Sequence, residues 1–258
     1  MEFSIIINTH DQSKFLGECI KSCINQNYSN YEIIIVDTSK KPSKDKYLKN
    51  KKIKYFHLRE NSRKFPVMNQ MYQIQYGFKR SKGKYICLLD GDDKFSKLKL
   101  CTLIKKYKKS KTQVIQDIPI LFSKGFKIKS VIKNFKKNVF FQRLFVSWPQ
   151  VFGTSTISCN RKILNKFFKE GKPFDYKFLA IDIKLIMFAT HKYNIINNFE
   201  GITFKRVHNK NLDKTYSNLL SSSFWLRRDM QIKYNYYLKK KLIFNLDFFI
   251  TKMINMFL

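Results

Sequence analysis

The sequence predicts an α/β fold with a mostly parallel central sheet and crossover helices. Short β-branched runs alternate with stretches in which apolar residues recur at helical spacing. Polar and acidic residues follow directly after several of the apolar runs. With 258 residues and 44% hydrophobic content, the chain has enough apolar side chains for a sizeable core. The strand–helix–strand order favours parallel strands, because each helix returns the chain to the starting edge of the sheet.

The N-terminal half contains the clearest elements. Strands are predicted at 3–8, 31–37, 53–58 and 85–89, and the β-branched runs at 3–8 and 31–37 are typical of strands buried on both faces. Helical spacing predicts helices over about 13–24, 66–81 and 97–109, and a polar loop over 40–52. We expect Asp11 and Ser13 to cap the first helix, and Pro66 to begin the second.

The second half is less regular. Residues 111–150 predict short strands and turns, and 150–166 predicts a Gly-Thr-Ser-Thr turn followed by a helix. A helix over 179–191 carries Asp182, and a strand over 202–207 leads to His208. From Ser221 onward the chain is predicted to be helical, aromatic and basic.

The net charge of +33 will attract nucleic acids, anionic lipid headgroups or acidic glycans. Only eight of the 51 basic residues are arginine, whereas arginine dominates where phosphate or guanine is recognised through two parallel hydrogen bonds. The bias toward Lys, Asn, Ile and Phe is typical of AT-rich coding, which accounts for part of the charge.

The cysteines predict a reducing compartment. They are odd in number, form no Cys-x-x-Cys pair, and are expected to be core thiols: Cys19, Cys23, Cys87, Cys101 and Cys159. We expect neither a secretory signal nor a membrane-spanning helix.

Asn8, Asp37 and the run Asp90–Asp93 stand at the carboxyl ends of predicted strands. Such ends meet at one edge of a parallel sheet, where ligands bind, so these side chains should converge. Carboxylates this close repel one another, so a pKa should rise unless a divalent cation is present. The alternative is a solvated turn in which an aspartate caps the next helix.

The opening SIIINTHDQSKFLGECIKSCINQNYSNYEIIIVDTS resembles inverting glycosyltransferase family 2, which has the GT-A fold. Positions that match the family pattern are Gln26, Tyr28, Glu32, Asp37, Gln70, Gly77, Gly83, the "LDxDD"-like run Leu89–Asp93, the Ser/Thr-rich stretch 148–162, and Arg206–Asn209 with Asn211. The resemblance covers about residues 1–212. The chain departs from the family pattern at Asn8–His10, at Thr38 and at Ile181.

The resemblance implies a Rossmann-like, mostly parallel sheet flanked by helices, with a C-terminal helical extension. Residues 1–115 would be the nucleotide-sugar-binding half, 116–212 the acceptor-binding half, and 213–258 a basic aromatic extension. The implied enzyme is a hexosyltransferase that depends on Mn²⁺ or Mg²⁺. It would move a sugar from a nucleotide-sugar to a glycan or lipid-linked acceptor with inversion, in cell-surface polysaccharide synthesis.

The resemblance also implies roles at the donor site. Thr9 and Asp37 would border the base and ribose, and Asp92 would lie near the ribose and diphosphate. Asp93 would ligate the metal together with Asp92. His208 would complete the metal or diphosphate site, and a plain loop histidine is the alternative.

Two further roles follow from the same resemblance. Asp182 would be the general base that takes the proton of the acceptor hydroxyl, with Asp175 as its nearest acidic competitor. Arg206 or Lys205 would add contacts to the phosphates.

Residues 224–258 combine aromatic residues, basic clusters and apolar runs. They predict either an interfacial helix on anionic lipid or a helical hairpin packed on the catalytic domain. We therefore expect a cytoplasmic location, with peripheral attachment to the inner face of the membrane as the open alternative.

Two other functions stay open. One is a nucleic-acid-binding protein, suggested by the charge, although the sequence has no zinc spacing or helix-turn-helix pattern and predicts no specific nucleic-acid partner. The other is an inactive glycosyltransferase-like scaffold.

Overall fold

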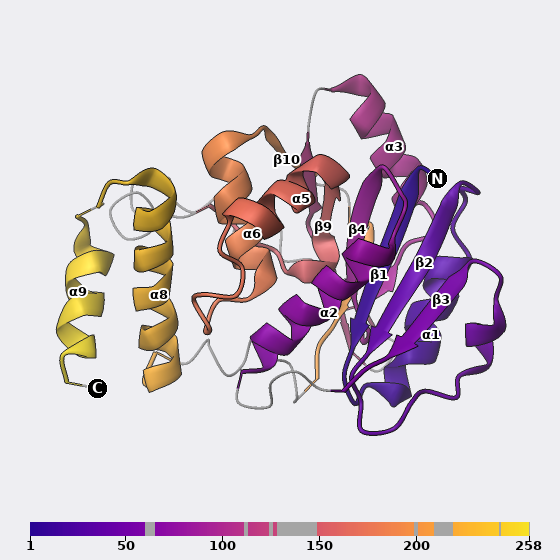
Figure 1. The fold of residues 1–258 in the computed structure, drawn as a ribbon, viewed down its shortest axis with the longest axis horizontal. Coiled ribbons are helices and arrows are strands. Elements are labelled where there is room, and N and C mark those ends of the chain that lie inside the picture. Colours follow the sequence, from indigo (N-terminus) through magenta and orange to yellow (C-terminus); the bar gives the residue numbers. More distant parts are fainter. Residues whose placement is uncertain are drawn as a thin grey trace.

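The computed structural model describes residues 1–59, 65–110, 113–123, 126–127, 149–198, 201–208, 219–242 and 244–257. The strands of its main sheet are β1 (Phe3–Thr9), β2 (Tyr31–Asp37), β3 (Ile53–His57), β4 (Tyr85–Asp90), β6 (Val114–Asp117), β9 (Ile157–Asn160) and β10 (Ile195–Asn198). Within the described residues these seven strands lie in the order β10-β6-β9-β4-β1-β2-β3 (Figure 1).

The main sheet is largely parallel, as predicted. β1 pairs in parallel with β2 and β4, and β2 with β3. β9 is the exception, because it runs antiparallel between β4 and β6. The sequence predicted only a turn and a helix in this stretch, so the strand was missed. Its four residues are too few to show a period.

A smaller sheet borders the main one. Its strands are β5 (Lys94–Phe95), β7 (Ile120–Ser123), β8 (Phe126–Lys127) and β11 (Thr203–Arg206), in the order β5-β11-β7-β8. β11 pairs antiparallel with β5, so the chain after residue 203 returns beside the acidic run that follows β4. This pairing brings together two segments that are far apart in the sequence.

Helices cover both faces of the main sheet (Figure 1). They are α1 (Ser13–Ile24), α2 (Pro66–Arg80), α3 (Lys99–Lys109), α5 (Arg161–Glu170) and α6 (Ile181–Lys192), with 3₁₀ turns η1 (Lys46–Lys49) and η3 (Thr154–Thr156). One face of β1, formed by Phe3, Ile5 and Ile7, packs with α1 and α3. On the other face, Ile6 packs with α2, α5 and α6. Because successive side chains of a strand point to opposite faces, the buried residues of β1 belong to two separate cores.

The predicted capping of α1 is wrong. The helix begins at Ser13, so Ser13 lies inside it, and Gln12 occupies the N-cap position. Asp11 has a left-handed backbone, with φ of 50°, and its Oδ1 accepts a hydrogen bond from the backbone N–H of Lys40. Asp11 therefore links the turn after β1 to the turn after β2 instead of capping the helix.

The cysteines are free thiols, and Cys19, Cys23, Cys87 and Cys159 are buried, as predicted. Burial raises the pKa of Cys87 to about 12, which leaves its thiol protonated and inert at neutral pH. Cys101 is only half-buried on α3, so the prediction of a core thiol is wrong at this position.

Helices α8 (Ser222–Lys239) and α9 (Leu246–Asn255) form the predicted C-terminal helical extension. In Figure 1 they stand side by side at the left edge, with α8 between α9 and the rest of the molecule. Among the helices that the structure describes, none combines the length and the apolar character needed to cross a bilayer.

Candidate active site

The carboxyl ends of β1, β2 and β4 meet at one edge, which confirms the predicted convergence. Thr9 lies opposite Asp37, and Asn8 lies opposite Asp90. The Asn8 Nδ2 donates a hydrogen bond of 2.9 Å to Asp90 Oδ1. The acidic run after β4 therefore sits beside the ends of the first two strands.

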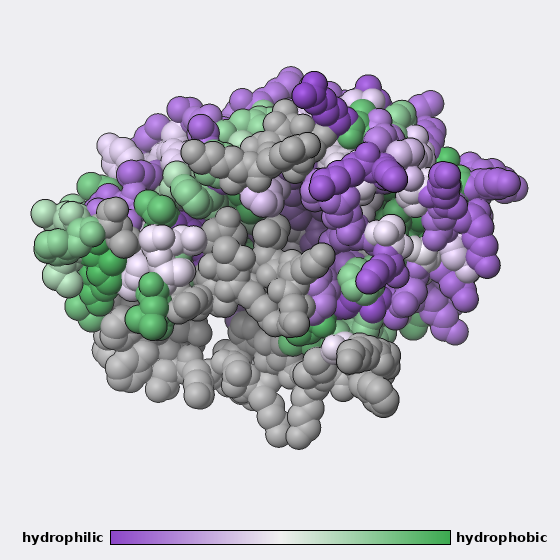
Figure 2. Space-filling model, turned by 90° about the horizontal axis from the view of Figure 1, so that it is seen from below, coloured by the Kyte–Doolittle hydropathy of each residue, from purple (hydrophilic) through white to green (hydrophobic). Residues whose placement is uncertain are grey.

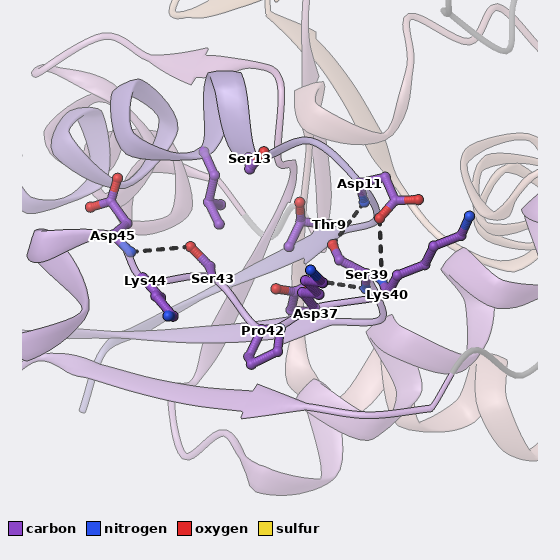
Figure 3. A pocket seen from close by; sticks show the side chains of 12 residues that line it. Thr9, Asp11, Ser13, Asp37, Ser39, Lys40, Pro42, Ser43, Lys44 and Asp45 are labelled. Atoms are coloured by element: carbon purple, nitrogen blue, oxygen red, sulfur yellow. Dashed lines mark hydrogen bonds between the residues drawn. The ribbon is translucent and has the colours of Figure 1, made fainter.

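A cavity of about 480 Å³ opens beyond β1 and β2 (Figure 3). Thr9 and Asp37 lie on its wall, as the donor-site prediction requires. The remaining lining comes from the turns after these strands and from α1, with three lysines among the polar side chains: Lys40, Lys41 and Lys44. This volume lies within the usual range of small-molecule sites, so the cavity can hold a ligand the size of a nucleoside.

Two donors fix the Asp37 carboxylate at the wall of this cavity. Tyr55 Oη donates to Asp37 Oδ2 at 2.7 Å, and the backbone N–H of Ser39 donates to Asp37 Oδ1 at 2.8 Å. Burial, followed by the hydrogen bond to Asp37, raises the pKa of Tyr55. Asp37 can therefore accept a further hydrogen bond from a ligand without changing its own orientation.

The acidic run is connected to the cavity through Gly91. Its backbone N–H donates to Asn8 O at 2.9 Å. A Cβ at this position would lie 2.5 Å from Thr9 Oγ1 and 2.7 Å from Thr9 Cβ. Only glycine fits here without a shift of the surrounding atoms, so the turn Asp90–Asp93 is held directly against the cavity wall.

Asp92 and His208 face each other beside this turn. His208 Nε2 lies 2.7 Å from Asp92 Oδ2. The imidazole stacks on Phe15 of α1 at 5.2 Å between ring centroids, with 24° between the planes. A carboxylate oxygen and an imidazole nitrogen are thus held together at the turn that contacts Thr9 of the cavity wall.

Asp93 is turned into the protein. Its Oδ2 accepts from Ser155 Oγ at 2.6 Å, and its Oδ1 accepts from the backbone N–H of Arg206 at 2.8 Å. Burial first, and then the charges of Asp92 and Asp90, raise its pKa well above the usual range. Asp93 ties η3 and β11 to the acidic turn. Its ligation of a metal stays a prediction, and this geometry favours it less than ligation by Asp92.

The Arg206 guanidinium is nearly buried between two rings. Its Cζ lies 4.5 Å from the ring centroids of both Phe15 and Phe122. Nε donates to the backbone O of Asp92 at 2.9 Å, and Nη2 donates to Glu18 Oε2 at 2.9 Å. This arrangement favours a supporting role for Arg206. Its contact with a diphosphate, like that of Lys205, stays a prediction.

Asp90 closes the other side of the site, facing α2. Gln70 Nε2 donates to its Oδ1 at 2.8 Å, and its backbone N–H donates to Ser155 Oγ at 3.0 Å. Burial first, and then the charge of Asp92, raise the pKa of Asp90 to about 7, with a smaller contribution from Asp182. The expected rise in pKa within the acidic run is confirmed, although desolvation contributes more than repulsion.

Asp182 lies in the first turn of α6, where its Oδ1 accepts from the backbone N–H of Ile183 at 2.8 Å. The charge of Asp182 contributes to the raised pKa of Asp90, so the Asp182 side chain lies near the acidic turn Asp90–Asp93. Asp175, its competitor, is exposed and pairs with Lys172 at 3.8 Å. The structure therefore favours Asp182 over Asp175 as the carboxylate of the site.

The Asp92–His208 pair fits a divalent cation. Two ligand atoms at right angles around an ion with bonds of about 2.0–2.1 Å stand about 3 Å apart, close to the spacing of this pair. A mixed oxygen and nitrogen set suits a transition-metal ion better than Mg²⁺, which prefers oxygen alone. Across the residues that the structure describes, no three His, Cys, Asp or Glu side chains gather to hold an ion. Substrate oxygens and water can supply further ligands, and Asp93 stays a predicted one.

Ser155, Glu18 and Phe15 were not identified from the sequence. Ser155 bridges the Asp90 N–H and Asp93 Oδ2, and it falls in the Ser/Thr-rich stretch that was noted only as a turn. Glu18 gave no signal beyond being an acid in a basic chain. Of the family segment after β11, Asn209 and Asn211 lie outside the described residues.

Comparison with known proteins identifies the family of the chain. The family model "Glycosyl transferase family 2" matches residues 4–168. An uncharacterized glycosyltransferase of Rickettsia conorii is 31% identical over 173 residues, or 60% of the chain, and the match covers 26% of that protein. A GalNAc(5)-diNAcBac-PP-undecaprenol beta-1,3-glucosyltransferase of Campylobacter jejuni is 29% identical over 110 residues, 41% of this chain and 34% of that protein.

Solved structures agree on the fold. TarS residues 1–349 of S. aureus, in complex with UDP-GlcNAc, aligns with a TM-score of 0.60 and 16% identity, over 91% of this chain and 66% of that one. The mannosyltransferase PcManGT of Pyrobaculum calidifontis, in complex with GDP-Man and Mn²⁺, aligns with a TM-score of 0.60 and 13% identity, over 90% and 62%. The fold is the GT-A fold that the sequence resemblance implied, and the chain belongs to glycosyl transferase family 2.

Proposed function

We propose that the chain transfers a sugar from a nucleotide-sugar to an acceptor hydroxyl, with inversion. One observation carries the proposal: the nucleoside-sized cavity and the Asp92–His208 pair flank the Thr9–Gly91 contact at one sheet edge. A binding site for the base and ribose is thereby joined to a site for a cation and a diphosphate. Asp182 provides a carboxylate in the same region.

The donor is oriented from the cavity. Asp37, held by Tyr55, accepts a hydrogen bond from the base, and Thr9 borders the ribose. Lys40, Lys41 and Lys44 add positive charge around a ligand that carries phosphates. The diphosphate then lies toward Asp92 and His208.

The transfer needs one carboxylate on the acceptor side. Asp182 takes the proton of the acceptor hydroxyl as its oxygen bonds to the anomeric carbon, and the bond from that carbon to the diphosphate oxygen breaks. A single displacement of this kind inverts the anomeric centre and forms no covalent enzyme intermediate. A divalent cation held by Asp92 and His208, with Asp93 as the further predicted ligand, would offset the negative charge on the leaving diphosphate.

The acceptor is proposed to be a glycan or a lipid-linked sugar used in cell-surface polysaccharide synthesis. The Campylobacter jejuni relative, whose name describes an undecaprenol-linked substrate, supports this class. Mn²⁺ is the proposed cation, supported by the donor set and by the Mn²⁺ complex of PcManGT. A lipid-linked acceptor would be met at the cytoplasmic face of a membrane.

The test is donor binding and turnover with purified protein and MnCl₂. A thermal-shift screen of nucleotide-sugars identifies the donor, because a ligand of the native state raises its stability. Slow release of nucleotide without acceptor then measures turnover. Asp182→Ala should retain donor affinity and lose transfer, by about 10²–10⁴-fold. Asp175→Ala, an exposed aspartate from the same segment, is the matched control and should change neither.

Other outcomes distinguish the alternatives. If a donor binds and no turnover or transfer is found with any metal, the chain is an inactive scaffold. If no nucleotide-sugar shifts the melting temperature, the proposal is overturned. Tight polynucleotide binding that survives physiological salt would then favour the nucleic-acid alternative, since purely electrostatic binding weakens steeply with salt.

A further inference from the structure

Helix α8 attaches the C-terminal hairpin to the catalytic body. Tyr234 of α8 is fully buried, and its hydroxyl lies within hydrogen-bond distance of two backbone oxygens, Gly171 O at 3.0 Å and Lys184 O at 3.3 Å. Its ring meets Tyr176 edge-on, with 4.9 Å between centroids. One face of α8 is therefore part of the protein core, which leaves α9 on the outside (Figure 1).

The contact between α8 and α9 is polar. Arg228 of α8 pairs with Asp247 of α9 at 3.1 Å, and Asp229 pairs with Lys252 at 2.6 Å. Asn255 Nδ2 donates to the backbone O of Trp225 at 3.1 Å. The α9 residues of this contact that lie at four-residue spacing are Asp247, Thr251 and Asn255, and the first two are buried.

The opposite face of α9 is apolar and exposed. Exposed fractions are 59% for Phe249 and 57% for Met253 of the helix, and 81% for Met256 and 86% for Phe257, which follow its last residue. Leu246 and Ile250 extend the same face at helical spacing. In Figure 2, hydrophobic residues gather at the left edge, over the α9 end of the molecule, whereas the opposite end is hydrophilic. A helix with its polar face inward and its apolar face outward has the reverse of the pattern expected in water.

Aromatic and basic residues border this face. Phe244, Phe248 and Phe249 pack on one another, with centroids 5.1–6.3 Å apart. The exposed lysines Lys239–Lys241 lie at the C-terminal end of α8 and directly after it. Aromatic rings beside lysines are typical of protein segments that lie at the boundary between lipid headgroups and acyl chains.

Charge decides which partner fits. A second copy of the chain would bring another +33 toward the same lysine cluster, and that repulsion opposes self-association. An anionic phospholipid surface attracts the lysines and can bury the apolar side chains at the same time. We propose that the α9 surface, formed by Leu246, Phe249, Ile250, Met253, Met256 and Phe257 with Lys239–Lys241, docks on anionic phospholipid.

This docking goes beyond the proposed transferase reaction and can fail or succeed independently of it. If both hold, the enzyme is attached where a lipid-linked acceptor would be presented. The two alternatives predicted for residues 224–258 then each describe one helix. Helix α8 packs on the catalytic body, and α9 turns its apolar face to lipid.

The test is co-sedimentation of the full chain with vesicles of phosphatidylglycerol and phosphatidylcholine, and with phosphatidylcholine alone. The wild type should bind the anionic vesicles. Phe249→Glu combined with Met253→Glu should lower the partition constant by about tenfold or more. Lys105→Gln combined with Lys108→Gln, at exposed positions of α3, changes the net charge equally and should leave binding within about twofold.

Replacing Lys239–Lys241 with glutamine provides a second variant that leaves the apolar face intact. It should reduce binding to anionic vesicles and flatten its salt dependence. Circular dichroism and donor-induced thermal shift check that each variant is folded. Wild-type protein that stays in the supernatant would overturn the proposal. Equal vesicle binding by the α9 and α3 variants would overturn it too. So would a dimer of the wild type in solution that dissociates only when the α9 residues are substituted.

Discussion

His208 Nε2 lies 2.7 Å from Asp92 Oδ2, although 116 positions separate the two residues in the sequence. The antiparallel pairing of β11 with β5 produces this contact, because it returns the chain beside the acidic turn. Asp93, the next residue, is directed away from this contact and bonds to Ser155 and the Arg206 backbone. The two adjacent aspartates thus have different partners: Asp92 meets His208, and Asp93 holds the turn to Ser155 and the Arg206 backbone.

We expect Asp92→Asn and His208→Ala each to weaken metal binding. Removing one of the proposed protein ligands should cost about 10–100-fold in Mn²⁺ affinity or more. Calorimetric titration of Mn²⁺ in the presence of UDP or GDP measures this. Melting temperatures without metal should stay close to the wild-type value, which separates lost ligation from lost folding. Unchanged Mn²⁺ affinity in both variants would exclude the pair as ligands.

Asp93→Ala should act on stability as well. The substitution leaves the Arg206 N–H without its carboxylate acceptor in a buried position, at a cost of about 1–3 kcal/mol in the free energy of unfolding. Urea unfolding without metal measures the loss, with Asp92→Asn as the neighbouring control. Full stability combined with lost Mn²⁺ affinity would instead support the role that the family resemblance implied, in which Asp93 ligates the metal.

Gly91→Ala should displace Thr9, a residue of the cavity wall. The new Cβ would lie 2.5 Å from Thr9 Oγ1, so Thr9 or the acidic turn must move. We expect a loss of about 1–3 kcal/mol in the free energy of unfolding, together with weaker nucleotide binding. Urea unfolding and a nucleotide titration measure the two effects. In a Thr9→Gly background, which removes both Oγ1 and Cβ, the loss of stability should be smaller, and an equal loss would show that the contact with Thr9 is not its cause.

The sheet and its ligand edge could be predicted from the sequence because both depend on local patterns. The β-branched runs of β1, β2 and β4 show their burial directly, and parallel pairing then places Asn8, Asp37 and the acidic run together. The position of Asp182 on a helix followed from apolar spacing alone. None of these steps needed knowledge of distant contacts.

The inner structure of the site could not be predicted in this way. Which of the buried Asp92 and Asp93 meets His208 depends on the pairing of a two-residue strand, β5, which is too short to leave a periodic signal. The role of Ser155 depends on β9, whose four residues were assigned to a turn and a helix. The engagement of Arg206 with Phe15, Phe122 and Glu18 is a tertiary relationship between segments that share no sequence pattern.

Lys184 should make stability depend on pH. Its side chain is fully buried in α6, its Nζ donates to Pro173 O at 2.6 Å, and burial lowers its pKa from 10.5 to about 7. Between about pH 7 and pH 10.5 the unfolded chain binds a proton here that the folded chain does not. This group therefore makes the protein more stable as pH rises through that window, and its full penalty, on the order of 4 kcal/mol, applies at and below pH 7.

Lys184→Met removes this penalty and gives up the hydrogen bond to Pro173. The free energy of unfolding of the variant minus that of the wild type should therefore be most favourable near pH 7 and should fall by a few kcal/mol toward pH 10. Urea unfolding at several pH values measures the difference. Lys105→Met, at an exposed position of α3, is the matched control and should show a nearly constant difference. A Lys184→Met difference as flat as that of the control would mean that Lys184 stays protonated in the folded protein, with its charge stabilised in place.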